Sequence, residues 1–302
     1  MVTDVKHAKM YTCQTTGREP TMKHLMISMM LIFSPLVMCG NTESFMEENN
    51  LYLEDNVNLM SNMTEDQFNS VIEDFQTRLG DISENTGMSL KVLGHWDDPT
   101  VNAYTYVQGN VRVVEIFGGL ARRSEVTVDA LTLVLCHEVG HHLGGFPTYN
   151  GQWASGEGQS DYYSTLVCAK TMWKNQCCQK SAKKQIPKHP KKLCDDVWWW
   201  KKDRQMCYRS MMAGKALGDL MSRSGSVDYD TPDENYVVKT YHSHPDAQCR
   251  LDTYMAGSLC DTTKWNHHVI PRTEEEAYSV SCPMGEYDVG WRPRCWFKPS
   301  GN

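Results

Sequence analysis

Residues 126–147 read VTVDALTLVLCHEVGHHLGGFP, and this stretch decides how the rest of the chain is interpreted. Apolar residues recur at helical spacing through its first half, and Ser124 just before it is a plausible helix start. The pair Gly144-Gly145, followed by Pro147, indicates where the helix ends. We therefore expect one buried helix over most of this stretch.

Inside this predicted helix lies the run His137-Glu138-Val139-Gly140-His141. Two histidines four residues apart project from one helix face and can bind one metal ion, and the glutamate between them lies beside the open coordination position. The pattern predicts His137 and His141 as zinc ligands and Glu138 as a general base. The alternative is a core helix with hydrogen-bonded histidines, but such a helix has no reason to bury an acid between them.

A third ligand is expected in the run Glu157-Gly158-Gln159-Ser160-Asp161, which opens a second predicted helix that extends to Trp173. Glu157 and Asp161 are four residues apart and therefore share a helix face. We expect Glu157 to be the carboxylate ligand. Asp161 is expected to accept the second ring N–H of a ligand histidine and so to fix its tautomer.

Two alternatives to this ligand set are weaker. His142 competes as a ligand, but its offset of five residues from His137 turns it away from the face that His137 and His141 share. The metzincin pattern requires a third histidine where this chain has Pro147.

Several motifs make the chain similar to a known family. Residues 102–161 resemble the gluzincin metallopeptidases of the HtpX heat-shock protease and CAAX prenyl endoprotease group, in a match that extends over roughly 64–255. The motifs that carry the resemblance are Asn102-Ala103-Tyr104, Gly118-Gly119-Leu120, the H-E-x-x-H run, the E-x-x-x-D run at Glu157, and Ser243-His244-Pro245 with Arg250.

The resemblance implies an α+β, zincin-type metallopeptidase domain, mainly helical, with a small sheet or hairpin beside the active helix. It implies that His244 approaches the zinc, either as a fourth ligand in a resting state or as a stabiliser of the oxyanion, and that Arg250 braces the site. His242 is close enough in sequence to substitute for His244. The membrane spans of the best-known members are missing, which favours an exported form of the catalytic domain.

The function implied is a zinc-dependent endopeptidase that hydrolyses exported or envelope proteins. Segments 104–108 and 111–117 alternate around Gly109-Asn110 and predict a hairpin, whose edge is expected to accept an extended substrate. The alternative is a low-turnover or inactive metal-binding chaperone or binding module of the same fold. An intact Glu138 favours the enzyme.

The remaining pattern predicts a single α+β catalytic domain. Thr64 and Gln67 form a capping box that predicts a helix over 64–80, and the pattern also predicts a strand at 89–94 and a helix at 204–222. The net charge of −7 and a pI of about 5.9 argue against a nucleic-acid partner. The partner expected is a protein or peptide substrate.

The domain boundaries follow from composition. We expect an upstream extension and signal peptide over 1–39, a polar linker over 40–63, a metallopeptidase domain over 64–270 and a cysteine-containing C-terminal extension over 271–302. The apolar run before Cys39 has the length of a secretory signal, and Cys39 sits in a lipobox-like context. The sequence therefore leaves three alternatives: a bacterial periplasmic or outer-membrane lipoprotein, a secreted protein, and a protein held by an uncleaved N-terminal anchor.

The cysteines suggest an oxidising compartment. Ten of them remain after Cys13 and Cys39 are set aside, an even number that fits disulfides. A Cys282–Cys295 bridge across a short loop is the pairing most favoured by the sequence. Cys136 and Cys168 lie within the two predicted active helices and could be small buried hydrophobes instead of disulfide cysteines. Four others are expected to staple the segment described next, namely Cys177, Cys178, Cys194 and Cys207.

Residues 170–207 form an insertion rich in lysine, tryptophan and cysteine, with Trp198-Trp199-Trp200 near its end. Three functional interpretations are a lid over the cleft, a surface for anionic lipid headgroups and a grip for acidic substrates. The structural alternative is a solvated, disulfide-stapled loop whose tryptophans pack on the domain. Membrane association would come from this segment or from a lipidated Cys39.

Overall fold

The computed structural model describes residues 42–54, 63–85, 87, 89–149, 152–174, 176, 185–223, 225–262 and 269–300. All of them belong to one unit of the chain, Thr42–Asn302. The predicted signal peptide and Cys39 lie outside the described residues. So do Cys177 and Cys178.

One four-stranded sheet has the order β1-β3-β4-β2, formed by β1 (Glu43–Ser44), β2 (Ser89–His95), β3 (Ala103–Gln108) and β4 (Val111–Phe117). β3 and β4 form an antiparallel hairpin around Gly109, whose φ of 60° is accessible to glycine at little cost. β2 runs parallel to β4, and β1 runs antiparallel to β3. The predicted hairpin and the predicted strand at 89–94 are confirmed.

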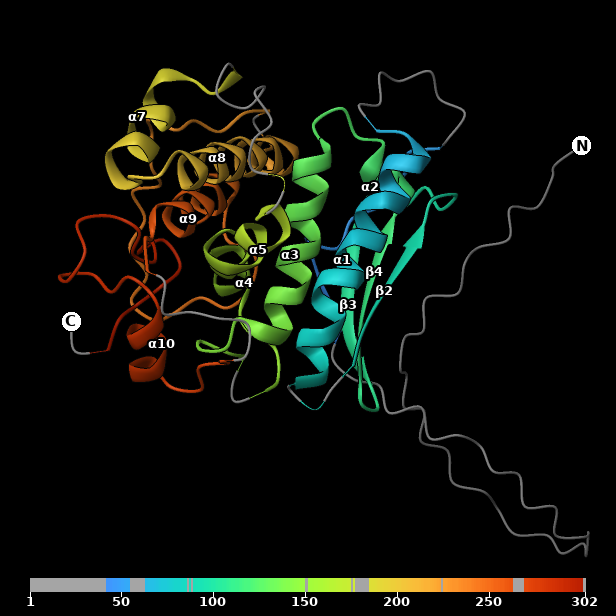
Figure 1. Cartoon of the computed structure of the whole chain (residues 1–302), viewed down its shortest axis with the longest axis horizontal. Helices are drawn as coiled ribbons and strands as arrows, with labels where there is room; N and C mark the ends of the chain where they lie inside the picture. The colour runs from blue at the N-terminus through green and yellow to red at the C-terminus, as the bar shows by residue number, and fades with distance from the viewer. Residues whose placement is uncertain are drawn as a thin grey trace, which may run out of the picture. The chain divides into compact units, whose positions relative to one another are not determined.

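Two long helices pack on this sheet and on each other, α1 (Glu65–Asn85) and α3 (Val128–Leu143) (Figure 1). The predicted capping box starts α1: the Thr64 amide donates to Gln67 Oε1 at 2.9 Å, and the Gln67 amide donates to Thr64 Oγ1 at 3.3 Å. The apolar stripe of α1 is buried against β2. The helix predicted over 64–80 therefore exists and extends to Asn85.

The helix start predicted at Ser124 is wrong. Its hydroxyl donates to the Glu125 carboxylate, and residues 123–126 form a turn that follows the short helix α2 (Gly118–Ala121). Thr127 caps α3 instead, because its hydroxyl oxygen accepts the Ala130 amide at 3.1 Å. The predicted end is confirmed, since α3 stops at Leu143 before the glycine pair.

The second predicted helix is confirmed as a continuous helical run that begins at Glu157 and ends at Trp173. It consists of α4 (Glu157–Tyr163), a π-helical turn η1 (Ser164–Cys168) and α5 (Ala169–Trp173). Cys168 in the π turn forms a disulfide with Cys136 of α3. This bridge joins the two helices that carry the predicted metal ligands.

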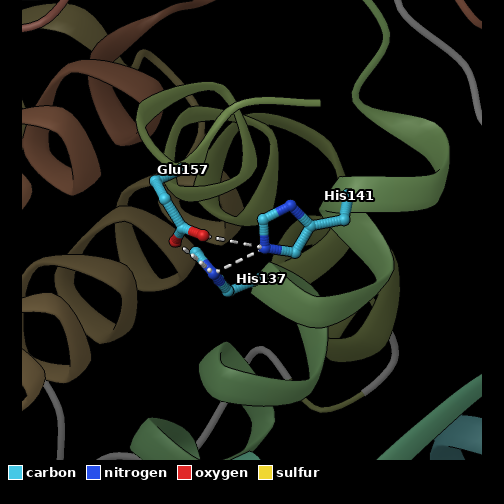
Figure 2. Close-up of side chains that lie close together, drawn as sticks. All are labelled: His137, His141 and Glu157. Atoms are coloured by element: carbon cyan, nitrogen blue, oxygen red, sulfur yellow. Dashed lines mark hydrogen bonds and ion pairs between the residues drawn. The ribbon is translucent and has the colours of Figure 1, made fainter. Parts of the chain in front are cut away.

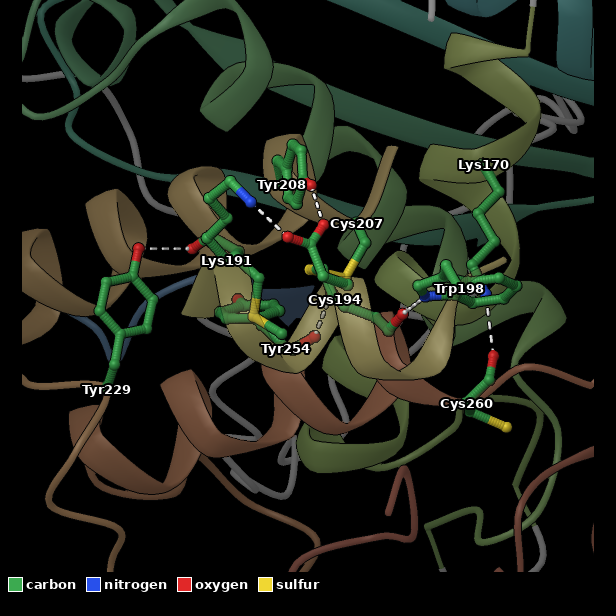
Figure 3. Close-up of a disulfide and its surroundings, with 12 residues drawn as sticks. Lys170, Lys191, Cys194, Trp198, Cys207, Tyr208, Tyr229, Tyr254 and Cys260 are labelled. Carbon is green, nitrogen blue, oxygen red and sulfur yellow. Dashed lines mark hydrogen bonds and ion pairs between the residues drawn. A yellow bond between two sulfur atoms is a disulfide. The ribbon is translucent and has the colours of Figure 1, made fainter. Parts of the chain in front are cut away.

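The remaining helices are α7 (Lys188–Val197), α8 (Lys201–Met221), α9 (Ala247–Leu259) and α10 (Glu274–Val280). α8 packs along α9 and against α3, and it confirms the helix predicted at 204–222. Cys194 and Cys207 form a disulfide between α7 and α8, as Figure 3 shows. Ile186, Cys194 and Cys207 of the insertion are buried in a second apolar cluster of the domain.

The tryptophans of the insertion divide into two kinds. Trp198 lies against the domain, donates its ring N–H to the Ser258 carbonyl at 3.0 Å and is covered by the Lys170 ammonium, which Figure 3 shows beside it. Trp199 and Trp200 are exposed, at 85% and 70%. Of the three consecutive residues Trp198, Trp199 and Trp200, only Trp198 therefore packs on the domain as expected, while Trp173 near the start of the insertion is also buried.

The Cys282–Cys295 pairing expected from the sequence is wrong. Cys295 pairs with Cys249 of α9, and Cys282 pairs with Cys260 just after the same helix. Nearness in sequence favoured the local bridge, but the C-terminal segment folds back along α9 and brings each cysteine to a distant partner. Four disulfides among the described residues fit an oxidising compartment.

Two segments that the sequence analysis placed outside the metallopeptidase domain make close contacts with it. Residues 42–54 were expected to belong to a polar linker, yet β1 joins the sheet and Phe45 is fully buried. Residues 271–300, expected to be an extension, carry two disulfides to the domain and the fully buried Trp296. Among the described residues, no helix has the length and apolar character needed to cross a membrane.

We predict that the Cys136–Cys168 bridge contributes strongly to stability. Replacing both cysteines by alanine should lower the free energy of unfolding by about 3 kcal/mol, because the bridge restricts the unfolded chain over 32 residues. Urea unfolding monitored by circular dichroism measures this change. Equal midpoints for the native chain and the double variant would contradict the prediction.

Candidate metal centre

Three buried side chains from α3 and α4 converge on one point, as Figure 2 shows. His137 Nε2 lies 3.2 Å from His141 Nε2 and 3.2 Å from Glu157 Oε2, and His141 Nε2 lies 3.5 Å from Glu157 Oε1. All three side chains are 0% exposed. The structure thus brings together the three residues that the sequence predicted as metal ligands.

The outer ring nitrogen of each histidine is held by an acceptor. His137 Nδ1–H donates to Asp161 Oδ1 at 2.6 Å, and His141 Nδ1–H donates to the Ser155 carbonyl at 2.8 Å. These contacts place a proton on Nδ1 and direct both Nε2 atoms toward the Glu157 carboxylate. Two imidazole nitrogens and a carboxylate that face one shared point fit a divalent cation such as zinc.

The charges of this cluster are strongly coupled. Burial works against a charge on His137, but the Asp161 carboxylate and its hydrogen bond raise the pKa of His137 to about 9. Burial lowers the pKa of His141 to about 4. Burial also opposes ionisation of Glu157, but the two histidines lower its pKa to about 2. A cation bound here would replace the proton of His137.

Asp161 connects the metal ligands to α9. Arg250 donates to both of its oxygens, from Nε to Oδ2 at 2.7 Å and from Nη2 to Oδ1 at 2.8 Å. Burial disfavours the Asp161 charge, but Arg250 and His137 hold the pKa of this carboxyl well below its usual range. Arg250 is 1% exposed and contacts the centre through Asp161.

Glu138 is fully buried between the two histidines in sequence, and neither of its carboxylate oxygens accepts a hydrogen bond from a described residue. Burial raises its pKa to about 8. The Glu138 carboxyl lies close enough to His137 and Glu157 to interact with both electrostatically.

His244 also reaches the site. Its Nε2 lies 3.5 Å from Glu157 Oε2 and donates to the Ser44 backbone carbonyl at 2.8 Å. The competing His242 lies against the Tyr149 ring instead, with ring centroids 5.7 Å apart. His142 points away from the ligands, because its Nε2 lies 2.6 Å from the Thr105 hydroxyl and its ring stacks on Trp153.

Close backbone packing brings the two ligand helices together. A Cβ on Gly140 would lie 2.9 Å from the Ser160 Cα and carbonyl oxygen, so only glycine allows α4 to approach α3 this closely. This contact places Glu157 within reach of both histidines. The close contact with Ser160 explains why glycine stands at position 140, the second unspecified position of the H-E-x-x-H run.

Two groups at the site were missed by sequence reasoning. The Tyr149 hydroxyl lies 3.5 Å from Glu157 Oε1, and Ser155 orients His141 through its backbone carbonyl. Both belong to the loop between α3 and α4. No residue pattern marks a backbone carbonyl as a partner, and a lone tyrosine in a loop carries no signal of its own.

Comparisons of the chain with protein-family models, with curated proteins and with solved structures give no match. The candidate centre therefore rests on its own geometry and on the motifs of the sequence.

We predict that the chain binds one divalent cation at this centre. Alanine at His137 or His141 should weaken zinc binding by more than about 100-fold, since even partners of ligand histidines contribute about 10–100-fold. The variant His189→Ala, at an exposed histidine paired with Asp230, should bind zinc as the native chain does.

The zinc affinity of the native chain should rise between pH 6 and pH 8, because the metal must displace the His137 proton. Competition titration with a zinc indicator measures these effects, and unaltered binding in both alanine variants would exclude the site.

We also predict that Arg250 is needed for folding of the site. The variant Arg250→Met leaves the buried Asp161 charge without its main partner and should cost about 3–5 kcal/mol in unfolding free energy. The variant Arg223→Met removes an exposed pair with Glu47 and should cause no measurable change. Chemical denaturation compares them, and similar midpoints for both variants would contradict the bracing role.

Proposed function

We propose that the chain is a zinc-dependent endopeptidase with a zincin-type catalytic domain. The single observation that carries this proposal is the fully buried Glu138, which accepts no hydrogen bond from the described part of the chain and lies beside three converging ligand groups, His137, His141 and Glu157. Two neutral imidazoles and one carboxylate leave a zinc ion with net positive charge, so that it would polarise a peptide carbonyl and lower the pKa of water.

Glu138 is the proposed general base. Its carboxylate takes a proton from the attacking water and then donates that proton to the leaving amine. Burial raises the pKa of Glu138 to about 8, close to the range in which a single group both accepts and releases a proton near neutral pH. None of the described residues competes for its oxygens by hydrogen bonding.

His244 is the proposed donor to the oxygen that becomes negatively charged. Its Nε2–H already donates to a backbone carbonyl, that of Ser44, beside the ligand cluster. A peptide carbonyl held in the same place would receive the same hydrogen bond, which strengthens as charge develops on the oxygen. The contact favours the role of oxyanion donor over that of fourth metal ligand, because a protonated Nε2 has no lone pair for zinc.

The proposed substrates are exported or envelope proteins, and the four disulfides support a location in an oxidising compartment. Export through an N-terminal signal, as a lipoprotein acylated at Cys39 or as a secreted protein, is a further part of the proposal, and membrane contact would come from a lipidated Cys39 or from the lysine-rich segment 170–207. The alternative, a metal-binding module without turnover, has no use for a buried Glu138.

We predict that Glu138→Gln retains zinc and loses peptide hydrolysis. The amide keeps the shape of the side chain but cannot accept the proton, so the rate should fall by about 100-fold or more relative to the native chain. Cleavage of a denatured fluorescent protein, with and without chelator, measures the loss, and metal analysis confirms retention. A variant with native turnover would refute the assignment of the base.

A further inference from the structure

The edge of the sheet next to the metal centre is already occupied by the chain itself. Residues of β1 pair antiparallel with β3, with Glu43 opposite Thr105 and Ser44 opposite Tyr104, and the Phe45 amide donates to the Ala103 carbonyl at 3.1 Å. Without this segment, β3 would be the edge strand of the hairpin. An exposed edge of this kind binds extended peptides by strand addition.

The same segment lies over the proposed catalytic groups. The Phe45 ring packs edge-on against the His137 ring with centroids 5.3 Å apart, and its carbonyl accepts from Arg250 Nη1 at 2.6 Å. The Ser44 carbonyl accepts from His244. Asn102 adds two hydrogen bonds to the Met46 backbone, at 3.0 and 3.2 Å.

Glu43 brings a carboxylate toward the ligands. It lies close enough to interact electrostatically with Glu157 and His137, and the Tyr149 hydroxyl hydrogen-bonds to it. With residues 42–54 in place, the side chains of the three ligands and of Glu138 are 0% exposed. An extended protein substrate therefore cannot reach Glu138 while the segment stays in place.

We propose that residues 42–54 are an autoinhibitory segment that occupies the substrate-binding edge of β3 and keeps the centre latent until it is displaced. The proposal rests on the proposed peptidase function and adds its regulation. It also indicates the substrate geometry: an extended chain antiparallel to β3, with one backbone carbonyl at His244 and an apolar side chain against His137.

The segment is held by the rest of the chain beyond the site. Leu53 accepts two hydrogen bonds from Arg122 through its carbonyl, at 3.0 and 2.8 Å, and its amide donates to Pro99. Covalent connection to α1 adds a high effective concentration, which a cut in the chain removes. Cleavage between Glu54 and Met63 should therefore weaken inhibition without altering the residues of the centre.

The experiment inserts a specific protease site between Glu54 and Met63 of the full chain and labels the segment with a fluorophore. After cleavage and dilution, release of the label should accompany a rise of at least tenfold in kcat/KM on a denatured protein. The control carries the same site between Thr262 and Val269, where the Cys260–Cys282 disulfide keeps the pieces together, and should stay at the uncut rate.

A second measurement does not depend on turnover. A synthetic peptide of residues 42–54 should bind the cut Glu138→Gln variant and be displaced by an unrelated unfolded peptide. Peptides with Phe45→Ala and Glu47→Ala test the contact, since Phe45 is fully buried and Glu47 is exposed. Only the Phe45→Ala peptide should lose affinity, by about tenfold or more.

The outcomes separate the two proposals. Equal rates before and after cleavage, without competition between peptides, would overturn the autoinhibitory segment and leave the peptidase intact. Competition without any hydrolysis would support occupation of the edge and overturn the peptidase. Absence of both hydrolysis and competition would overturn both proposals.

Discussion

The hydrogen bonds of the buried Asp161 carboxylate with His137 and Arg250 hold the candidate metal centre together. Asp161 belongs to α4. Its carboxylate accepts one hydrogen bond from His137 of α3 and two from Arg250 of α9. One charge therefore fixes three helices relative to one another. It also fixes the tautomer of His137, without which Nε2 would not face His141 and Glu157. The same Arg250 reaches the Phe45 carbonyl and so connects the ligand network to the segment that covers it.

Packing and covalent bonds keep this network in place. Gly140 allows α4 to approach α3, and the disulfide from Cys136, the residue before His137, to Cys168 of η1 joins the same two helical runs. The C-terminal segment is tied to α9 by two further disulfides. A rigid frame of this kind suits a centre whose buried charges are stable only while every partner stays within hydrogen-bond distance.

Much of the centre could be predicted from the sequence, because its ligands come from two short helical motifs whose internal spacing fixes their direction. His137, Glu138 and His141 share one turn of helix, and Glu157 and Asp161 share another, so helical geometry alone predicts their relations. The contributions of Ser155, Tyr149 and residues 42–46 could not be predicted, because they depend on how distant segments meet. The predicted Cys282–Cys295 pairing failed for the same reason. The two cysteines are near in sequence, yet Cys295 pairs with Cys249 of α9 and Cys282 pairs with Cys260.

His137, His141 and Glu157 are proposed to bind one metal ion between them. The most direct test is a crystal structure of the zinc-loaded chain with anomalous diffraction recorded on both sides of the zinc absorption edge. We expect one anomalous peak at about 2.0–2.2 Å from His137 Nε2, His141 Nε2 and a Glu157 oxygen. A zinc-loaded crystal without a peak at this point, or with its zinc bound by other residues, would contradict it.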